Sequence, residues 1–287
     1  MSELYWGSPR PDGKVRFGRT GAPLELANIE RYIAVGDSFT DGMIDPRPSG
    51  VMRGWADRLA VELSAQRLAA GLPPLQYANL AVGGRLMANI TQVQLPQALD
   101  LSGHLISIVG GGNDALRPRF SARPLLQQLD TAVARARDTG AEVLLGTYVD
   151  CSDSPLLSLL DHRFVALSEG VRAIAERRDV RLLDKWLIPS LKDWRAWAPD
   201  HIHLSTRGHK IVTRAALEAL GLADDRHEWA ARPADAVVRL PWRENVRWLR
   251  RDVGPWLRRH LTRRRPGKAP QPSHPRLVPV DPATFLD

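Results

Sequence analysis

Short apolar runs alternate with longer amphipathic stretches along most of this chain. The runs have the near-continuous apolar character of buried strands and occupy residues 31–35, 75–80, 104–109, 142–147 and 180–184. Between them, apolar residues recur every three or four positions, as at 55–63, 122–138, 156–178 and 206–220. Gly71, Gly140 and Gly221 follow such stretches, where helices commonly end. The pattern predicts alternating strands and helices.

Strands that are apolar on both faces and alternate with helices indicate an α/β fold, a three-layer sandwich with a central parallel sheet flanked by helices. In such sheets, functional residues gather beyond the carboxyl ends of the strands. Ser38, Gly84 and Asn113 each follow a predicted strand. We therefore expect these three residues to lie along one edge of the sheet.

Two segments near opposite ends of this region carry candidate chemistry. Gly36-Asp37-Ser38-Phe39-Thr40-Asp41-Gly42 follows the first predicted strand, and Asp200-His201-Ile202-His203 precedes the last predicted helix. A serine becomes a nucleophile when a neighbouring base takes its proton, and a carboxylate fixes the tautomer of that base. Each segment alone is an ordinary turn, but together they are the parts of a nucleophilic hydrolase.

Glycines and an asparagine follow two other predicted strands, in the segments Gly83-Gly84-Arg85 and Gly110-Gly111-Gly112-Asn113-Asp114. Glycine lets the backbone approach a ligand and expose its N–H groups, and an asparagine amide adds a side-chain donor. Such donors can form an oxyanion hole, which binds the charge that develops during acyl transfer. The alternative is that these glycines are turn residues without chemistry.

With these four segments in this order, the chain resembles the SGNH hydrolase family of GDSL-type esterases and lipases. The resemblance spans about residues 30 to 220 and is carried by 36–42, 79–84, 111–114 and 200–203. It implies the flavodoxin-like, three-layer fold of that family. It also implies Ser38 as the nucleophile, His203 as the base and Asp200 as the residue that orients His203. The implied oxyanion donors are the Ser38 backbone N–H, a glycine of the second block and the Asn113 side chain.

One position within the resemblance stays open. Gly83 and Gly84 both fit the glycine of the second block, and we favour Gly84 because the family glycine usually lies five residues after the asparagine, here Asn79. Phe39 stands where the family name has a leucine. One apolar residue replaces another there, so the assignment is unaffected.

No metal or cofactor is expected. The segment that contains Asp200, His201, His203 and His209 has residue types that ligate zinc, but no second cluster of ligands accompanies it. We expect His201 to lie at the surface or in a pocket wall and His209 to be a helix residue. The sequence also lacks a phosphate-binding loop and a complete dinucleotide fingerprint.

Three other residues have reactive side chains but are expected to play no chemical role. Asp37 and Asp41 are expected to form turn and helix-cap hydrogen bonds rather than to act as an acid or a base. Cys151, the single cysteine, is flanked by Asp150 and Asp153, whose charges oppose a thiolate nucleophile.

The length of 287 residues suits one catalytic domain with extensions. We place an N-terminal extension at 1–29, the catalytic domain at 30–222 and a basic C-terminal extension at 223–287. The sequence has no apolar stretch of ~18 residues that could span a membrane. Its first residues lack the basic and apolar regions of a signal peptide. With one cysteine, these features favour the cytoplasm.

The C-terminal extension carries most of the positive charge. From Trp242 onward there are eleven Arg and Lys against four Asp and Glu, while the whole chain has a net charge of +8. Between Trp242 and Leu261, apolar residues recur at helical spacing, and we expect them to dock on the catalytic domain. Weak contact of the arginines with a membrane surface is the alternative, and no nucleic-acid partner is expected. Residues after Pro266 are expected to be extended or without regular structure.

These observations predict a serine esterase that hydrolyses a small-molecule acyl ester. Lipid, acetylated sugar, thioester and aryl ester substrates all remain open, and the sequence says nothing of the oligomeric state. An acyltransferase that uses the same serine is the alternative among enzymes. A non-catalytic adaptor acting through the basic extension is the alternative among other classes.

Overall fold

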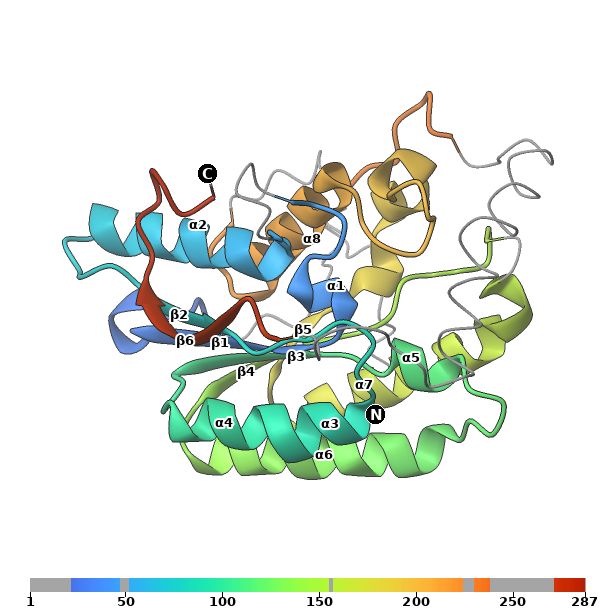
Figure 1. Ribbon diagram of the computed structural model, residues 1–287, viewed down its shortest axis with the longest axis horizontal. Helices are drawn as coiled ribbons and strands as arrows, with labels where there is room; N and C mark the ends of the chain where they lie inside the picture. Colours follow the sequence, from blue (N-terminus) through green and yellow to red (C-terminus); the bar gives the residue numbers. More distant parts are fainter. Residues whose placement is uncertain (1–21, 47–51, 155–156, 224–229, 238–270, 287) are drawn as a thin grey trace.

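The computed structural model describes residues 22–46, 52–154, 157–223, 230–237 and 271–286. Within them, one six-stranded sheet is covered by helices on both faces, so the predicted three-layer α/β fold is confirmed (Figure 1). The strand order is β5-β4-β3-β1-β2-β6. The strands are β1 (Arg31–Gly36), β2 (Gln76–Asn79), β3 (Leu105–Val109), β4 (Glu142–Gly146), β5 (Arg181–Leu183) and β6 (His274–Pro279).

The first five strands are parallel, and each lies within the apolar run that predicted it or extends it by one residue. In the centre, Gly36 at the end of β1 is paired with Val109 at the end of β3. Because the strands run in one direction, the loops that follow β1, β2 and β3 leave from the same edge of the sheet.

The helices cover the sheet in two groups. On one face lie α1 (Ser38–Asp41), α2 (Trp55–Ala69) and α8 (Thr206–Ala219); the other carries α3 (Met87–Asn89), the π-helix η2 (Ile90–Gln94), α4 (Leu95–Asp100), α6 (Ala122–Asp138) and α7 (Asp161–Arg178). The short α5 (Gly112–Ala115) follows β3. The 3₁₀ helices are η1 (Leu26–Asn28), η3 (Leu157–Leu160), η4 (Lys185–Leu187), η5 (Pro189–Lys192) and η6 (Trp194–Ala196).

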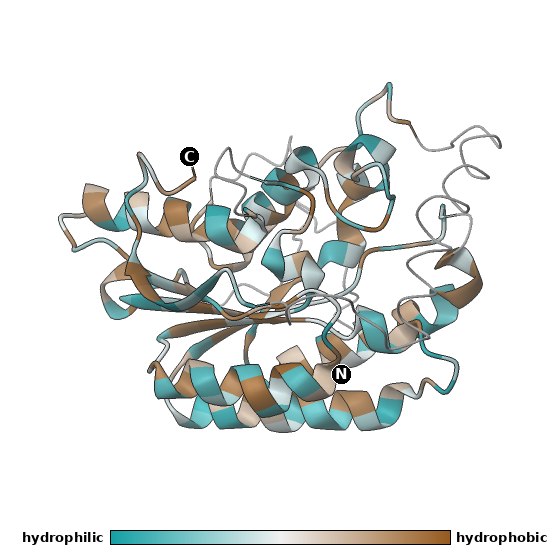
Figure 2. Ribbon diagram, viewed as in Figure 1, coloured by the Kyte–Doolittle hydropathy of each residue, from teal (hydrophilic) through white to brown (hydrophobic). Residues whose placement is uncertain are grey.

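The strands contribute alternate residues to two separate apolar layers. Tyr32 and Ala34 of β1 pack with Trp55 of α2 in one layer, whereas Ile33 and Val35 face the other. Figure 2 shows apolar residues concentrated in the sheet and polar residues along the outer sides of the helices. This burial of both faces explains why the strands read as continuous apolar runs.

Glycine ends three of the helical segments as predicted. Gly71, Gly140 and Gly221 all have positive φ, the left-handed conformation that favours glycine after a helix. No helix among the described residues is long and apolar enough to cross a membrane.

The sequence did not predict the sixth strand. Residues 274–279 are extended, which was one of the two expectations for the Pro-rich end, but they are paired antiparallel to β2. Val280, directly after β6, is fully buried, and its carbonyl oxygen accepts a 2.6 Å hydrogen bond from Ser64 Oγ. The extension 223–287 therefore contributes to the sheet. The predicted helical segment from Trp242 to Leu261 lies outside the described residues.

We predict that Val280→Ala lowers the free energy of unfolding by about 2 kcal/mol, because it removes two buried carbon atoms at about 0.8 kcal/mol each and leaves a small cavity. Arg276→Ala, at an exposed position of β6, is the matched control. Denaturant unfolding of both variants measures the difference. Equal stabilities would mean that the docking of β6 contributes nothing to the fold.

Candidate active site

Ser38 begins α1, directly beyond the carboxyl end of β1. Asp37 caps this short helix by accepting a 3.1 Å hydrogen bond from the Phe39 backbone N–H, so its expected cap role is confirmed. Gly36 must be a glycine, because a Cβ atom there would collide with the carbonyl oxygen of Val109. The close packing of β1 on β3 thus fixes the position from which Ser38 projects.

Asp200 and His203 form a close polar pair at this edge. The distance between His203 Nδ1 and Asp200 Oδ2 is 2.6 Å. The other carboxylate oxygen of Asp200 accepts the backbone N–H groups of Ile202 and His203, at 3.1 and 3.0 Å. Burial raises the pKa of Asp200, but the hydrogen bond and charge of His203 and the two amides more than offset it, so the pKa lies below its ordinary value.

The backbone around His203 is held from both sides. The Ala198 N–H donates to the His203 carbonyl oxygen at 2.8 Å, and Ser205 caps the start of α8 by accepting from the Gly208 N–H. His201 has a positive φ of 51°, and its ring lies 4.9 Å from that of Trp194, between centroids. His201 therefore turns away from the Asp200–His203 pair and lines a smaller neighbouring cavity.

Ser38, Asn113 and His203 line one cavity of about 380 Å³, which we call the serine pocket. Its walls are mainly apolar and are formed by Phe39, Val109, Leu116, Val149, Leu157, Leu159, Leu160, Phe164, Trp197 and Ile202, among others. Asp200 stands behind His203 and is not part of the wall. The parallel sheet and the loop before α8 thus bring the predicted nucleophile, base and orienting carboxylate together.

The Asn113 amide is directed by two acceptors. Its Nδ2 group donates to Asp37 Oδ2 at 3.2 Å and to the Arg85 carbonyl oxygen at 3.1 Å. Burial raises the pKa of Asp37 to about 6. An oxyanion that accepts from Asn113 must replace one of these two acceptors. Sequence reasoning assigned Asp37 only a cap, and its bond to Asn113 has no local sequence signal.

The structure distinguishes between the two glycines of the second block. Gly83 lies beside Ser38, and its N–H is used by Asp41 Oδ2 at 3.3 Å. Gly84 has a positive φ of 73°, and within the described part of the chain its N–H has no hydrogen-bond partner. Neither glycine lines the serine pocket. The unused N–H favours Gly84 over Gly83 as the candidate donor to an oxyanion.

Asp41 and Cys151 are other residues with reactive side chains near the pocket. Asp41 holds the Gly83 amide, and burial raises the pKa of its carboxyl to about 6. Cys151 lines the pocket, but burial, with Asp161 and Asp150 nearby, raises the pKa of its thiol to about 12. A thiol with that pKa stays protonated near neutral pH and is a poor nucleophile.

His209 is a buried helix residue of α8, as expected. Its Nδ1 atom accepts a 3.2 Å hydrogen bond from the Trp55 backbone N–H. Burial lowers the pKa of its imidazole to about 3. Among the residues that the structure describes, no group of three or more His, Cys, Asp or Glu side chains is arranged to hold a metal ion.

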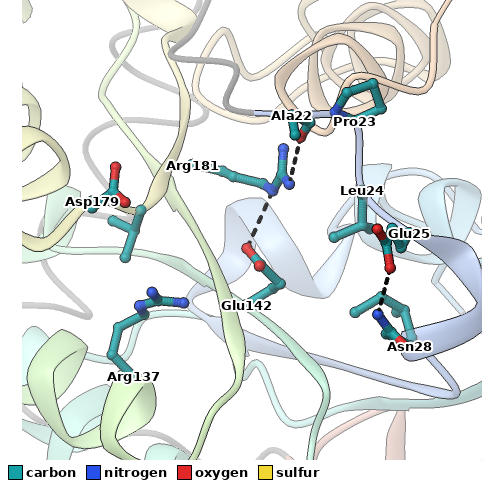
Figure 3. Close-up of a pocket in the computed structure, with 11 residues that line it drawn as sticks. Ala22, Pro23, Leu24, Glu25, Asn28, Arg137, Glu142, Asp179 and Arg181 are labelled. Atoms are coloured by element: carbon teal, nitrogen blue, oxygen red, sulfur yellow. Dashed lines mark hydrogen bonds and ion pairs between the residues drawn. The ribbon is translucent and has the colours of Figure 1, made fainter.

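A second cavity, of about 330 Å³, lies at the opposite edge of the sheet, where β4 and β5 begin (Figure 3). Arg181 donates there to Glu142 at 3.3 Å and to the Ala22 carbonyl oxygen at 2.9 Å. These charged groups satisfy one another, and the cavity contains none of the predicted site residues. The serine pocket is therefore the candidate active site.

Sequence reasoning missed a positively charged residue of the serine pocket. Lys185, in η4 directly after β5, is 3% exposed and lines the pocket with Ser38 and His203. Lys185 belongs to no recognisable motif, and a lysine after a strand is usually exposed to solvent, so the sequence gives no reason to single it out.

Comparison with protein families gives a match over residues 34–211 to the model described as the GDSL-like Lipase/Acylhydrolase family. This segment contains all four sequence blocks. No curated protein matches the chain.

Several solved structures share the fold. A variant of an acetyl xylan esterase from Geobacillus stearothermophilus has a TM-score of 0.56 and 18% identity, covering 69% of this chain and 97% of its own. LAE5, an alpha/beta hydrolase from the metagenome of Lake Arreo, Spain, has a TM-score of 0.55 and 20% identity, covering 72% and 98%. A putative GDSL-like lipase from Parabacteroides merdae has a TM-score of 0.54 and 17% identity, covering 67% and 95%. At these identities, the likeness shows the fold.

We predict that His209 makes the protein less stable in acid. Its folded-state pKa of about 3 lies below the unfolded value near ~6.5, so protons bind the unfolded chain more strongly between these values. The free energy of unfolding then falls as the pH drops through this window, by about 2 kcal/mol near pH ~5 from this residue alone. Denaturant unfolding at several pH values should show that the free energy of unfolding of His209→Gln falls less with decreasing pH than that of the wild type. The control is His162→Gln, at an exposed position; equal pH profiles for wild type and His209→Gln would contradict the prediction.

Proposed function

The chain belongs to the GDSL-like lipase/acylhydrolase family, a family of ester-hydrolysing enzymes, and on this premise we propose that it is a serine esterase with Ser38, His203 and Asp200 as its catalytic triad. The observation that carries the proposal is the 2.6 Å contact between His203 Nδ1 and Asp200 Oδ2, beside the pocket that holds Ser38. A carboxylate on Nδ1 favours the tautomer whose Nε2 lone pair is free to accept a proton.

In this mechanism, Ser38 Oγ attacks the ester carbonyl carbon while His203 Nε2 takes its proton. The tetrahedral intermediate collapses, the C–O bond to the alcohol breaks, and His203 returns the proton to the leaving oxygen. Water then attacks the acyl-enzyme by the same route and releases the acid. Within the described residues, no hydrogen bond joins Ser38 to His203, although both line the same pocket. We expect this hydrogen bond to form when the substrate binds, because catalytic hydrogen bonds often tighten in the enzyme–substrate complex.

The proposed oxyanion hole consists of the Ser38 backbone N–H, the Gly84 N–H and Asn113 Nδ2. The Ser38 N–H stands at the start of α1, where helix N–H groups lack intrahelical partners. The free N–H of Gly84 and the location of Asn113 in the pocket support the other two assignments. Negative charge on the carbonyl oxygen would draw Asn113 away from Asp37 or Arg85.

The apolar walls support an acyl group as the part of the substrate that enters the pocket. An acyltransferase would use the same acyl-enzyme and pass the acyl group to an alcohol. An adaptor acting through the basic extension would need no reactive serine. Product analysis with an added alcohol separates hydrolysis from acyl transfer. Covalent labelling of Ser38 would exclude a purely non-catalytic adaptor.

We predict that a fluorophosphonate probe labels Ser38, because the activated serine attacks phosphorus as it attacks an ester. Ser38→Ala should lose labelling and lower kcat by roughly 10⁴- to 10⁶-fold with an unchanged melting temperature. Ser152→Ala, at an exposed position, is the control that should keep both. A folded Ser38→Ala enzyme with near-wild-type turnover would refute the assignment.

We predict that Asn113→Ala lowers kcat by about 10²- to 10³-fold and changes KM little, because the amide donates mainly to the charge of the transition state. Asn28→Ala, at the opposite edge of the sheet, should leave both constants unchanged. Steady-state kinetics on one ester measures the split. A raised KM with unchanged kcat would reassign Asn113 to ground-state binding.

A further inference from the structure

Lys185 is a buried cation in the wall of the serine pocket. Its side chain is 3% exposed, and Nζ lies 4.3 Å from the centre of the Phe39 ring, next to the nucleophile. Among the described residues, no hydrogen bond or ion pair reaches this ammonium group. The Phe39 ring is a direct contact that favours the positive charge of Lys185.

Two carboxylates, Asp184 and Asp37, act electrostatically on Lys185, but both accept hydrogen bonds from other residues. Asp184 accepts two hydrogen bonds from Arg172, at 2.7 and 3.1 Å, and one from Thr147 at 3.0 Å. Asp37 accepts from Phe39 and Asn113. Neither forms an ion pair with Lys185, so the positive charge of the pocket is left without a direct counterion.

Burying an ammonium group without a counterion is unfavourable, so the Lys185 side chain loses its proton more easily than a solvated lysine does. Burial lowers the pKa of Lys185 to about 7, although Asp37 and Asp184 oppose this shift. A bound anion would complete the site, because it supplies the missing counterion and accepts the unused N–H donors. The walls around it leave room for a short carbon chain.

We propose that Lys185 makes this enzyme selective for esters whose acyl chain ends in a free carboxylate, the monoesters of short dicarboxylic acids. The inference rests on the proposed function and names its substrate class. The ester carbonyl lies at Ser38, and the carboxylate at the far end of the acyl chain binds Lys185 Nζ. The carboxylate forms no covalent bond, and hydrolysis yields the dicarboxylic acid and the alcohol.

The test compares pairs of substrates that differ only in this charge. Monoethyl succinate and monoethyl glutarate are each paired with the neutral ester in which the free acid is an amide, and ethanol release gives kcat/KM. Wild type should favour the charged member of at least one pair by about 10- to 100-fold, the range of a charge-assisted hydrogen bond. Lys185→Met should reduce that ratio to about one.

Controls separate this inference from the proposed function. Lys210→Met removes an exposed lysine and should keep the wild-type ratio. If Ser38→Ala abolishes turnover but the ratio is near one in wild type, or is equal in wild type and Lys185→Met, selectivity by Lys185 is refuted and the esterase stands. If Ser38→Ala keeps its activity, the proposed function itself fails. Should Lys185→Met not fold, Lys185→Gln replaces it, and a wild-type ratio near one refutes the inference without any variant.

Discussion

The parallel pairing of β1 with β2 and β3 is the constraint on which the site depends. It sends the chain out of the sheet at one edge three times, after Gly36, Asn79 and Val109. The hydrogen bonds from Asn113 to Asp37 and Arg85 then tie the three loops to one another. A shift of one residue in either pairing would move these groups to opposite faces, because strand side chains alternate.

Much of the fold could be predicted because its signals are local. The helix α6 has the limits predicted from its apolar spacing, and the first five strands are continuous apolar runs. The strand β6 could not be predicted in this way. It contains Pro275 and Pro279, which cannot donate backbone hydrogen bonds to a neighbouring strand, and it depends for its pairing on β2, a distant part of the chain.

The site was predictable to the extent that sequence spacing fixes geometry. Asp200 and His203 stand three residues apart, and that turn brings their side chains into contact. The resemblance supplied Ser38 and Asn113, but the structure was needed to show that Asp37 directs Asn113. Lys185 could not be found, because burial of a lysine is decided by tertiary packing around Phe39 rather than by its neighbours in sequence.

The pairing of His274 with Asn79 also has a consequence for synthesis on the ribosome. The β2 segment is made early and its partner much later, so one side of the growing sheet keeps its backbone groups exposed while the intervening chain is translated. Exposed strand edges recruit other strands. The nascent chain therefore passes through an interval in which the β2 edge is open to pairing with other strands, and that interval ends when β6 has left the exit tunnel and pairs with β2.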